Sequence, residues 1–131
     1  MTQPFIFVGT HKLKEGKWEE YRKVLQELVE VVESNEPRLI AFNVYFDEEN
    51  YEVTGVQVHP DSDSMQFHLK VVSEHIQTAY GDYIDRTQGM QILGPLSEEL
   101  LENMIQYSPP GTPVKVAQIH EVGFTRSNAA R

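Results

Sequence analysis

Residues 51–76, YEVTGVQVHPDSDSMQFHLKVVSEHI, have the pattern of a strand, a tight turn and an amphipathic helix. The segment from Tyr51 to His59 mixes β-branched and aromatic residues, which suit a half-buried strand. Pro60 cannot donate a hydrogen bond to a strand ladder, so it ends the strand. The side chains of residues 61–63, Asp-Ser-Asp, can accept hydrogen bonds from the N–H groups that open a helix. The stretch therefore predicts a strand that passes directly into a helix.

The predicted helix has a single apolar stripe. Asp63 and Gln66 fit a capping box at its start. Apolar side chains then recur at spacings of four and three, at Met65, Leu69, Val72, Ile76 and Ala79. A helix with one apolar side packs that side on the core, so we expect a strand-helix unit that faces a sheet.

Similar units precede this stretch. Residues 4–11 form a compact apolar run that predicts a strand, and a helical stripe follows at Trp18, Tyr21, Leu25, Leu28 and Val32. Pro37 ends that helix, because the residue before a proline avoids the helical region. Residues 39–46, LIAFNVYF, predict a strand, and the short turn at 47–50 pairs it with residues 51–59 as an antiparallel hairpin.

The pattern is weaker after Ala79. We interpret residues 80–113 as an inserted short helical segment, with a short strand at 90–93 and a helix that Ser97 caps. Residues 114–124 predict the last strand, and 126–131 a mobile tail. This order predicts one α+β domain over residues 1–125, a ferredoxin-like split βαβ with four antiparallel strands and helices on one face. The other sheet face is partly apolar, so we expect a second copy to cover it in a homodimer.

Composition limits the classes of partner. The chain has 131 residues and a formal charge of −9, so nucleic acid and anionic membrane are not expected partners. It has no cysteine, which fits a reducing cytoplasm, our expected location. No apolar stretch approaches the roughly 20 residues that span a bilayer, and residues 1–10 lack the basic start of a signal peptide.

The chain resembles the antibiotic biosynthesis monooxygenase group of dimeric α/β-barrel proteins. The resemblance lies in FIFVGTHKLKEGKWEEYRKVLQEL, IAFNVYFDEENYEVTGVQVHPD and SMQFHLKVVSEHI. It implies two ferredoxin-like sheets paired as a barrel. Several members of the group oxidise phenols or quinols with dioxygen and no cofactor, whereas others degrade haem. The group commonly carries histidines on the second helix, where His68 and His75 stand here.

His68 and His75 are candidate ligand-binding residues on the predicted second helix. Seven residues place them two turns apart, roughly 10 Å along the axis, which is too far for one metal ion. We therefore predict no metal site on this helix. The alternative is that both are polar residues at the margin of the apolar stripe.

Strand alternation predicts a second set of site residues. If Phe42 and Val44 face the helices, one consistent assignment collects polar side chains on the opposite face. That set is Asn43, Tyr45, Gln57, His59, Gln118 and His120, with Thr10 or His11 added according to register. The face would line a small-molecule pocket, or it would be a wet dimer interface whose polar groups pair with one another.

The predicted function is a cofactor-independent monooxygenase that acts on a small hydroxylated aromatic, either a quinol or a polyketide-like molecule. His59 or His120 would be the general base, because imidazole titrates near neutral pH. Asn43 and Gln57 would hydrogen-bond the oxyanion, Tyr45 would stack on the ring, and Gln118 would add a polar contact. No cofactor is expected. The alternatives are a non-enzymatic protein of this fold that binds a small ligand or haem, and a structural dimer with a vestigial pocket.

Overall fold

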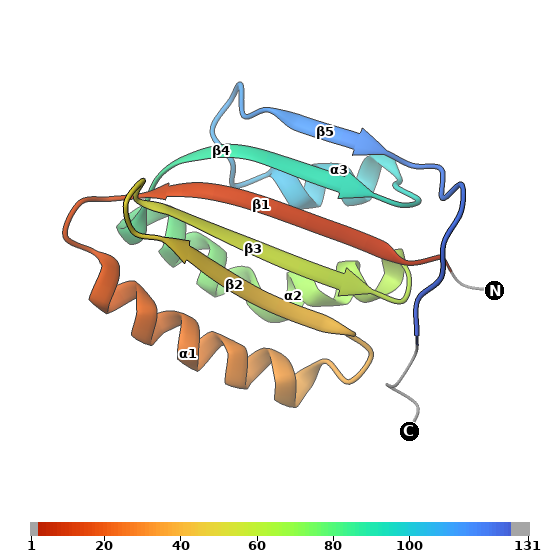
Figure 1. Cartoon of the computed structure of the whole chain (residues 1–131), viewed down its shortest axis with the longest axis horizontal. Coiled ribbons are helices and arrows are strands. Elements are labelled where there is room, and N and C mark those ends of the chain that lie inside the picture. Colours follow the sequence, from red (N-terminus) through yellow and green to blue (C-terminus); the bar gives the residue numbers. More distant parts are fainter. Residues whose placement is uncertain (1–2, 127–131) are drawn as a thin grey trace.

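The computed structural model describes residues 3–126, which form a single sheet with helices on one of its faces (Figure 1). The strands within these residues are β1 (Phe5–Leu13), β2 (Ala41–Asp47), β3 (Glu52–His59), β4 (Ile84–Leu93) and β5 (Val114–Ala117). The helices are α1 (Trp18–Asn35), α2 (Ser62–Thr78), the π-helical turn η1 (Ala79–Tyr83) and α3 (Glu98–Ile105). The predicted mobile tail, 126–131, lies outside the described residues except for Arg126.

The sheet order is β2-β3-β1-β4-β5. The first four strands are antiparallel to their neighbours, and β5 runs parallel to β4 at the edge. Helix α1 connects β1 to β2, and α2 connects β3 to β4, so each connection passes over one intervening strand. This is the ferredoxin-like split βαβ that the sequence predicts, with one additional edge strand.

Two clusters of buried apolar side chains join the helices to the sheet. Tyr21 and Leu25 of α1 pack with Val53 of β3 in one cluster. Met65 of α2 packs with Ile92 of β4 in the other. Both clusters lie on the helix-covered face, so this face holds the core of the domain.

The start of α2 is capped as the composition of residues 61–63 suggests, but at a different residue from the predicted box. Asp61 accepts a hydrogen bond from the backbone N–H of Ser64 at 3.0 Å and also pairs with Arg38. The predicted partner of Asp63, Gln66, has a buried side-chain oxygen that no described residue bonds. The helix therefore begins two residues earlier than a box at Asp63 would allow.

The region after α2 differs most from the sequence interpretation. The short strand expected at 90–93 extends back to Ile84, and as β4 it is the fourth strand of the ferredoxin-like sheet. Register shifts against β1 place its buried residues at spacings of three, three and two, at Ile84, Thr87, Met90 and Ile92. These bulges remove the period-two pattern by which a strand is recognised. The last strand ends at Ala117 rather than at Phe124, and as β5 it is a parallel fifth strand at the edge, not the fourth antiparallel strand that the sequence predicts.

The helix that Ser97 caps is present as α3, where the Ser97 side chain accepts from the N–H of Leu100 at 3.1 Å. Across residues 3–126, no helix combines the length and apolar character that a membrane span requires.

Candidate active site

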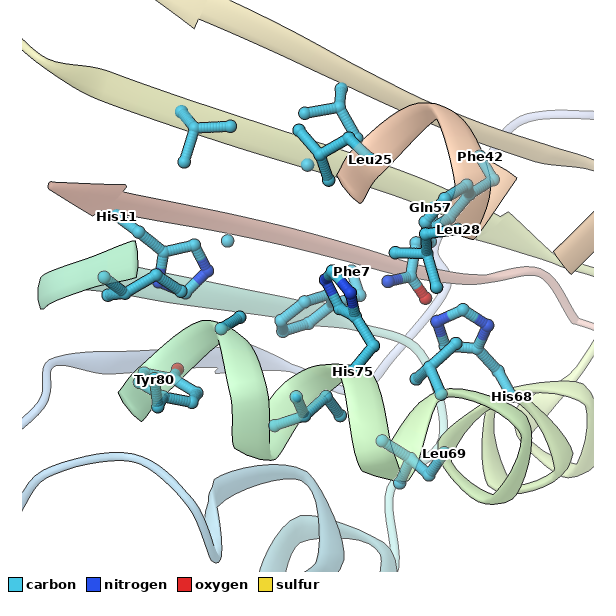
Figure 2. Close-up of a pocket in the computed structure, with 18 of the residues that line it drawn as sticks. Phe7, His11, Leu25, Leu28, Phe42, Gln57, His68, Leu69, His75 and Tyr80 are labelled. Carbon is cyan, nitrogen blue, oxygen red and sulfur yellow. The ribbon is translucent and has the colours of Figure 1, made fainter. Parts of the chain in front are cut away.

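A cavity of about 140 Å³ lies between the sheet and helices α1 and α2 (Figure 2). Its wall is mainly aliphatic and aromatic, with contributions from β1 to β4. The hydrogen-bonding side chains among its lining residues are His11, Tyr21, Gln57, His68, His75 and Tyr80. An apolar cavity with a few polar groups is the usual form of a small-molecule site.

His68 and Glu36 form a buried pair at one end of the cavity. Nδ1 of His68 lies 2.8 and 3.0 Å from the two carboxylate oxygens of Glu36. The side chains are only 3% and 2% exposed. Because a carboxylate only accepts, Nδ1 carries the proton and donates to Glu36. The opposite edge of the His68 ring faces the cavity (Figure 2).

Glu36 is positioned by the end of helix α1. The helix closes at Glu36, whose backbone N–H still donates to the carbonyl of Val32 at 2.9 Å, and Pro37 follows. The side chain of Glu36 thereby reaches His68 of α2, which lies 32 positions further along the chain.

His59 supports this end of the cavity from behind. Its Nε2 lies 3.0 Å from Oε1 of Gln57, and its Nδ1 lies 2.8 Å from Oγ of Ser64. Burial, with a smaller contribution from the neighbouring His68, lowers the pKa of His59 to about 3. The neutral ring therefore donates from Nε2 to Gln57 and accepts from the hydroxyl of Ser64. With both nitrogens occupied, His59 holds Gln57 in place beside the cavity.

A second polar group lies at the other end of the cavity. Nδ1 of His11 is 2.9 Å from Oγ1 of Thr87, which is 2.9 Å from the hydroxyl of Tyr80. The Tyr80 hydroxyl lies 3.4 Å from Oγ of Ser108. Burial lowers the pKa of His11 to about 4, so its ring is neutral at physiological pH.

Two local irregularities bring these residues together. The bulge between β1 and β4 falls at His11 and pairs it with Thr87. The π-helical turn η1 contains Tyr80, and its ring packs edge-on against His11 at 5.8 Å. Such π-turns and bulges often accompany functional sites.

His75 lies between the two ends on α2 (Figure 2). Its ring stacks on Tyr21, with centroids 6.1 Å apart. Burial, and to a smaller extent His68, lowers the pKa of His75 to about 4. His75 is therefore a neutral polar group in the cavity wall.

The residues predicted to share one sheet face are divided by the structure. Phe42 pairs directly with Gln57, so Gln57 and His59 lie on the helix-covered face. Asn43 and Tyr45 lie on the opposite face. The predicted common face is wrong because β3 is apolar on both sides: Val53 faces the helices, whereas the next valine, Val56, pairs with Asn43 on the other face.

Gln118 and His120 lie outside the cavity. Both follow the end of β5 and are exposed. Oε1 of Gln118 accepts from the backbone N–H of Leu96 at 3.2 Å. The structure thus brings His68, His75 and Gln57 to the cavity, places His59 behind them, and leaves Asn43, Tyr45, Gln118 and His120 elsewhere.

Sequence reasoning missed Glu36, Thr87 and Tyr80. Glu36 reads as an ordinary helix-end residue, and its partner is 32 positions away. His11 was an option that depended on register, and the pairing with Thr87 decides it. Among residues 3–126, no group of three or more carboxylate or imidazole side chains is arranged to hold a metal ion.

No protein-family model matches the sequence, and no curated protein matches it either. Solved structures do. MupZ from Pseudomonas fluorescens is 17% identical, with a TM-score of 0.70 and 95% of each chain covered. A candidate antibiotic biosynthesis monooxygenase from Chloroflexus aurantiacus J-10-fl is 15% identical, with a TM-score of 0.56 over 72% of this chain and 95% of that one.

A second candidate antibiotic biosynthesis monooxygenase, from Bacteriodes thetaiotaomicron VPI-5482, is 18% identical. It has a TM-score of 0.53 over 65% of this chain and 83% of its own. The two monooxygenase candidates cover about two thirds of this chain, whereas the likeness to MupZ extends over nearly all of it. The chain therefore has the ferredoxin-like α+β fold of the antibiotic biosynthesis monooxygenase-like proteins.

Proposed function

We propose that the chain is a cofactor-independent monooxygenase that oxidises a small hydroxylated aromatic in this cavity, with His68 as the general base. The observation that carries the proposal is the buried His68–Glu36 pair, which faces an otherwise mainly apolar cavity. The fold shared with candidate antibiotic biosynthesis monooxygenases supports the reaction class.

Glu36 prepares His68 for proton transfer in two ways. It holds the proton on Nδ1, so that Nε2 keeps its lone pair for the substrate. It also stabilises the imidazolium that forms when Nε2 takes a proton. Both effects are stronger beside a mainly apolar cavity than in water, because the local dielectric constant is lower.

The reaction follows for a substrate with an activated ring CH₂ group, as in anthrone. His68 takes one proton from the substrate, and the resulting carbanion is delocalised over the hydroxylated ring system. It passes one electron to dioxygen, and the two radicals combine to form a peroxide at the carbon. The peroxide then loses water to leave a carbonyl, so that R₂CH₂ and O₂ give R₂C=O and H₂O. The substrate supplies all four electrons, and His68 returns its proton to the departing hydroxide.

The proposed general base is His68, not His59 or His120 as the sequence suggested. His59 has both ring nitrogens bonded within the protein, and His120 is exposed beyond β5. Gln57 lines the cavity without Asn43, and in this proposal its amide N–H donates to the oxyanion.

Of the non-enzymatic alternatives, a small-ligand carrier fits the cavity better than a haem protein does. A cavity of about 140 Å³ is close to the roughly 150 Å³ that holds benzene. This volume suits the one reacting ring of a larger substrate such as anthrone, and it is too small for the macrocycle of haem. A carrier would use the same cavity but would have no need of a base.

The test is oxygen consumption with anthrone and a panel of quinols. Wild-type protein should consume oxygen and, under ¹⁸O₂, place one labelled atom in the carbonyl product of anthrone. His68→Gln should lower the rate at least 100-fold, since general-base catalysis contributes about 10²–10⁴.

Glu36→Gln should lower the rate less, because an amide oxygen still accepts from Nδ1 without stabilising the imidazolium as strongly. His120→Gln is the matched control, since it changes an exposed histidine outside the cavity. Equal rates in wild type and His68→Gln would remove His68 from the mechanism. Tight binding without any oxygen consumption would identify a carrier instead.

A further inference from the structure

The cavity has a polar group at each of its two ends. His68, with Glu36, lies near Phe42, whose ring centroid is 5.4 Å from that of His68. Phe42 pairs with Gln57, and Gln57 with Phe7 of β1, so this end lies at the level of Phe7. His11 lies four residues further along β1, about 13 Å away at the rise of an extended strand. Figure 2 shows the two imidazoles at opposite ends of the labelled side chains.

The nitrogen of His11 that faces the cavity is identified by its surroundings. Nδ1 is engaged by Thr87, and a Cβ atom placed on Gly9 would meet the Phe7 ring at 3.1 Å and Nε2 of His11 at 3.4 Å. Gly9 itself lines the cavity, so Nε2 of His11 reaches across a position that has no side chain. The absence of a side chain at Gly9 leaves this position to the rings of Phe7 and His11, both of which line the cavity.

The hydrogen-bond chain behind His11 can run in either direction. Thr87, Tyr80 and Ser108 are all hydroxyls, and each can donate or accept. In one direction Nε2 of the neutral ring accepts from a ligand hydroxyl, and in the other it donates to a ligand carbonyl. The chain ends at Ser108, which is half-buried, so a proton taken from the ligand oxygen can leave toward the surface.

We propose that the cavity binds a flat molecule with an oxygen atom at each end, one facing His68 and the other hydrogen-bonded to Nε2 of His11. This inference rests on the proposed binding of hydroxylated aromatics in the cavity. A 1,4-dihydroxybenzene ring matches it: the two hydroxyls point in opposite directions, and the ring faces the apolar wall between them. Loss of the proton at the His11 end moves one proton from the ligand O–H to Nε2 and one from Nδ1 to Thr87. Thr87 then passes its own proton to Tyr80, Tyr80 passes one to Ser108, and Ser108 releases one to solvent.

The binding of hydroquinone, phenol and resorcinol tests this inference. Dissociation constants are measured by NMR titration of the whole chain in oxygen-free buffer, so that oxidation does not interfere. Wild-type protein should bind hydroquinone at least about tenfold more tightly than phenol, the factor that corresponds to 1.4 kcal/mol. Resorcinol should resemble phenol, because its second hydroxyl points to the side of the ring.

Variants at the His11 end assign the preference to that end. His11→Phe keeps an aromatic ring beside Tyr80 and removes the nitrogens, so hydroquinone and phenol should bind with equal affinity. Thr87→Val removes the hydroxyl that holds Nδ1, and it should also reduce the preference for hydroquinone over phenol. It serves as the test if His11→Phe does not fold. Thr10→Val is the matched control, because the Thr10 hydroxyl bonds Thr54 at 3.1 Å on the other face of the sheet.

Each outcome has a distinct meaning. The two-ended arrangement would be overturned if wild-type protein bound hydroquinone and phenol with equal affinity. It would also be overturned if the preference for hydroquinone were unchanged in both His11→Phe and Thr87→Val. Neither result would contradict the proposed function. Failure of all three compounds to bind would overturn both. A hydroquinone preference that depends on His11, in a protein that consumes no oxygen, would support the site and reject the monooxygenase.

Discussion

Three histidines on the helix-covered face are held neutral by the fold. Burial lowers the pKa of His59 to about 3 and the pKa values of His11 and His75 to about 4. The pKa of a free histidine is about 6.5. Below that pH, these histidines are therefore protonated in the unfolded chain but remain neutral in the folded chain. These side chains are therefore useful as hydrogen-bonding groups at neutral pH, while their charged forms oppose folding.

The free energy of unfolding should consequently fall as the pH drops from about 6.5 toward about 4. In that window the unfolded state carries more protons, so stability rises with pH and is fully present above 6.5. For the fully buried His59, the slope reaches about 1.4 kcal/mol per pH unit. Urea denaturation at several pH values between 7.5 and 4.5 measures the dependence.

The contribution of His75 to this pH dependence can be measured with one variant. His75→Phe preserves the stack on Tyr21 and removes one titrating ring, so its stability should vary less steeply with pH than that of wild type. The acidic groups that change over the same range are common to both proteins and cancel in the comparison. Identical slopes in the two proteins would show that His75 titrates normally in the folded state.

At the scale of elements, β4 and α2 determine the site together. Strand β4 contributes Thr87 to the cavity network and Ile92 to the core. Helix α2 and its π-helical turn carry His68, His75 and Tyr80 along the length of the cavity. A segment that the sequence suggests is an insertion is thus part of the central sheet.

Truncation of Ile92 tests whether β4 is central to the domain. Ile92 is 0% exposed, so Ile92→Ala should destabilise the fold by about 2–5 kcal/mol. Ile119→Ala makes the same chemical change at a residue that is 84% exposed beyond β5, and it should alter stability by less than about 0.5 kcal/mol. Chemical denaturation of both variants gives the difference. Similar small effects would place β4 outside the cooperative core.

At the scale of the whole molecule, one sheet face is covered by helices and the other is not. The second face carries alternate residues of the central strands, among them Val8, which pairs with Val56. Tyr45 on the same face is 61% exposed. A partly apolar sheet face of this kind is a typical surface for association with a second copy.

We therefore expect a homodimer at micromolar concentration, with a mass about twice the 15.1 kDa of the chain. Val56→Asp should place a carboxylate in the centre of the interface and yield a folded monomer. Val31→Asp is the control, because Val31 is 46% exposed on α1, away from this face, and the dimer should persist. Light scattering reports the mass, and circular dichroism confirms that each variant is folded. A monomeric wild type would exclude the paired barrel.

The types of most elements were determined by the local sequence. The apolar stripes of α1 and α2, the stop at Pro37 and the serine cap of α3 involve residues within a few positions of one another. Such local signals act before any tertiary contact forms, so the order of elements from β1 to α2 and the ferredoxin-like fold could be predicted. Strand β4 was only partly predictable, because its bulges depend on how it pairs with β1.

The site was decided by tertiary structure. Alternation divides a strand into two sets of residues, but it does not say which set faces the helices when both are apolar, as in β3. The pairing of Phe42 with Gln57 settles that choice and separates Asn43 and Tyr45 from His59. The two polar ends of the cavity join residues that are 32 and 76 positions apart, His68 with Glu36 and His11 with Thr87. No local pattern records such contacts, because they exist only once the helices have packed on the sheet and the strand register is set.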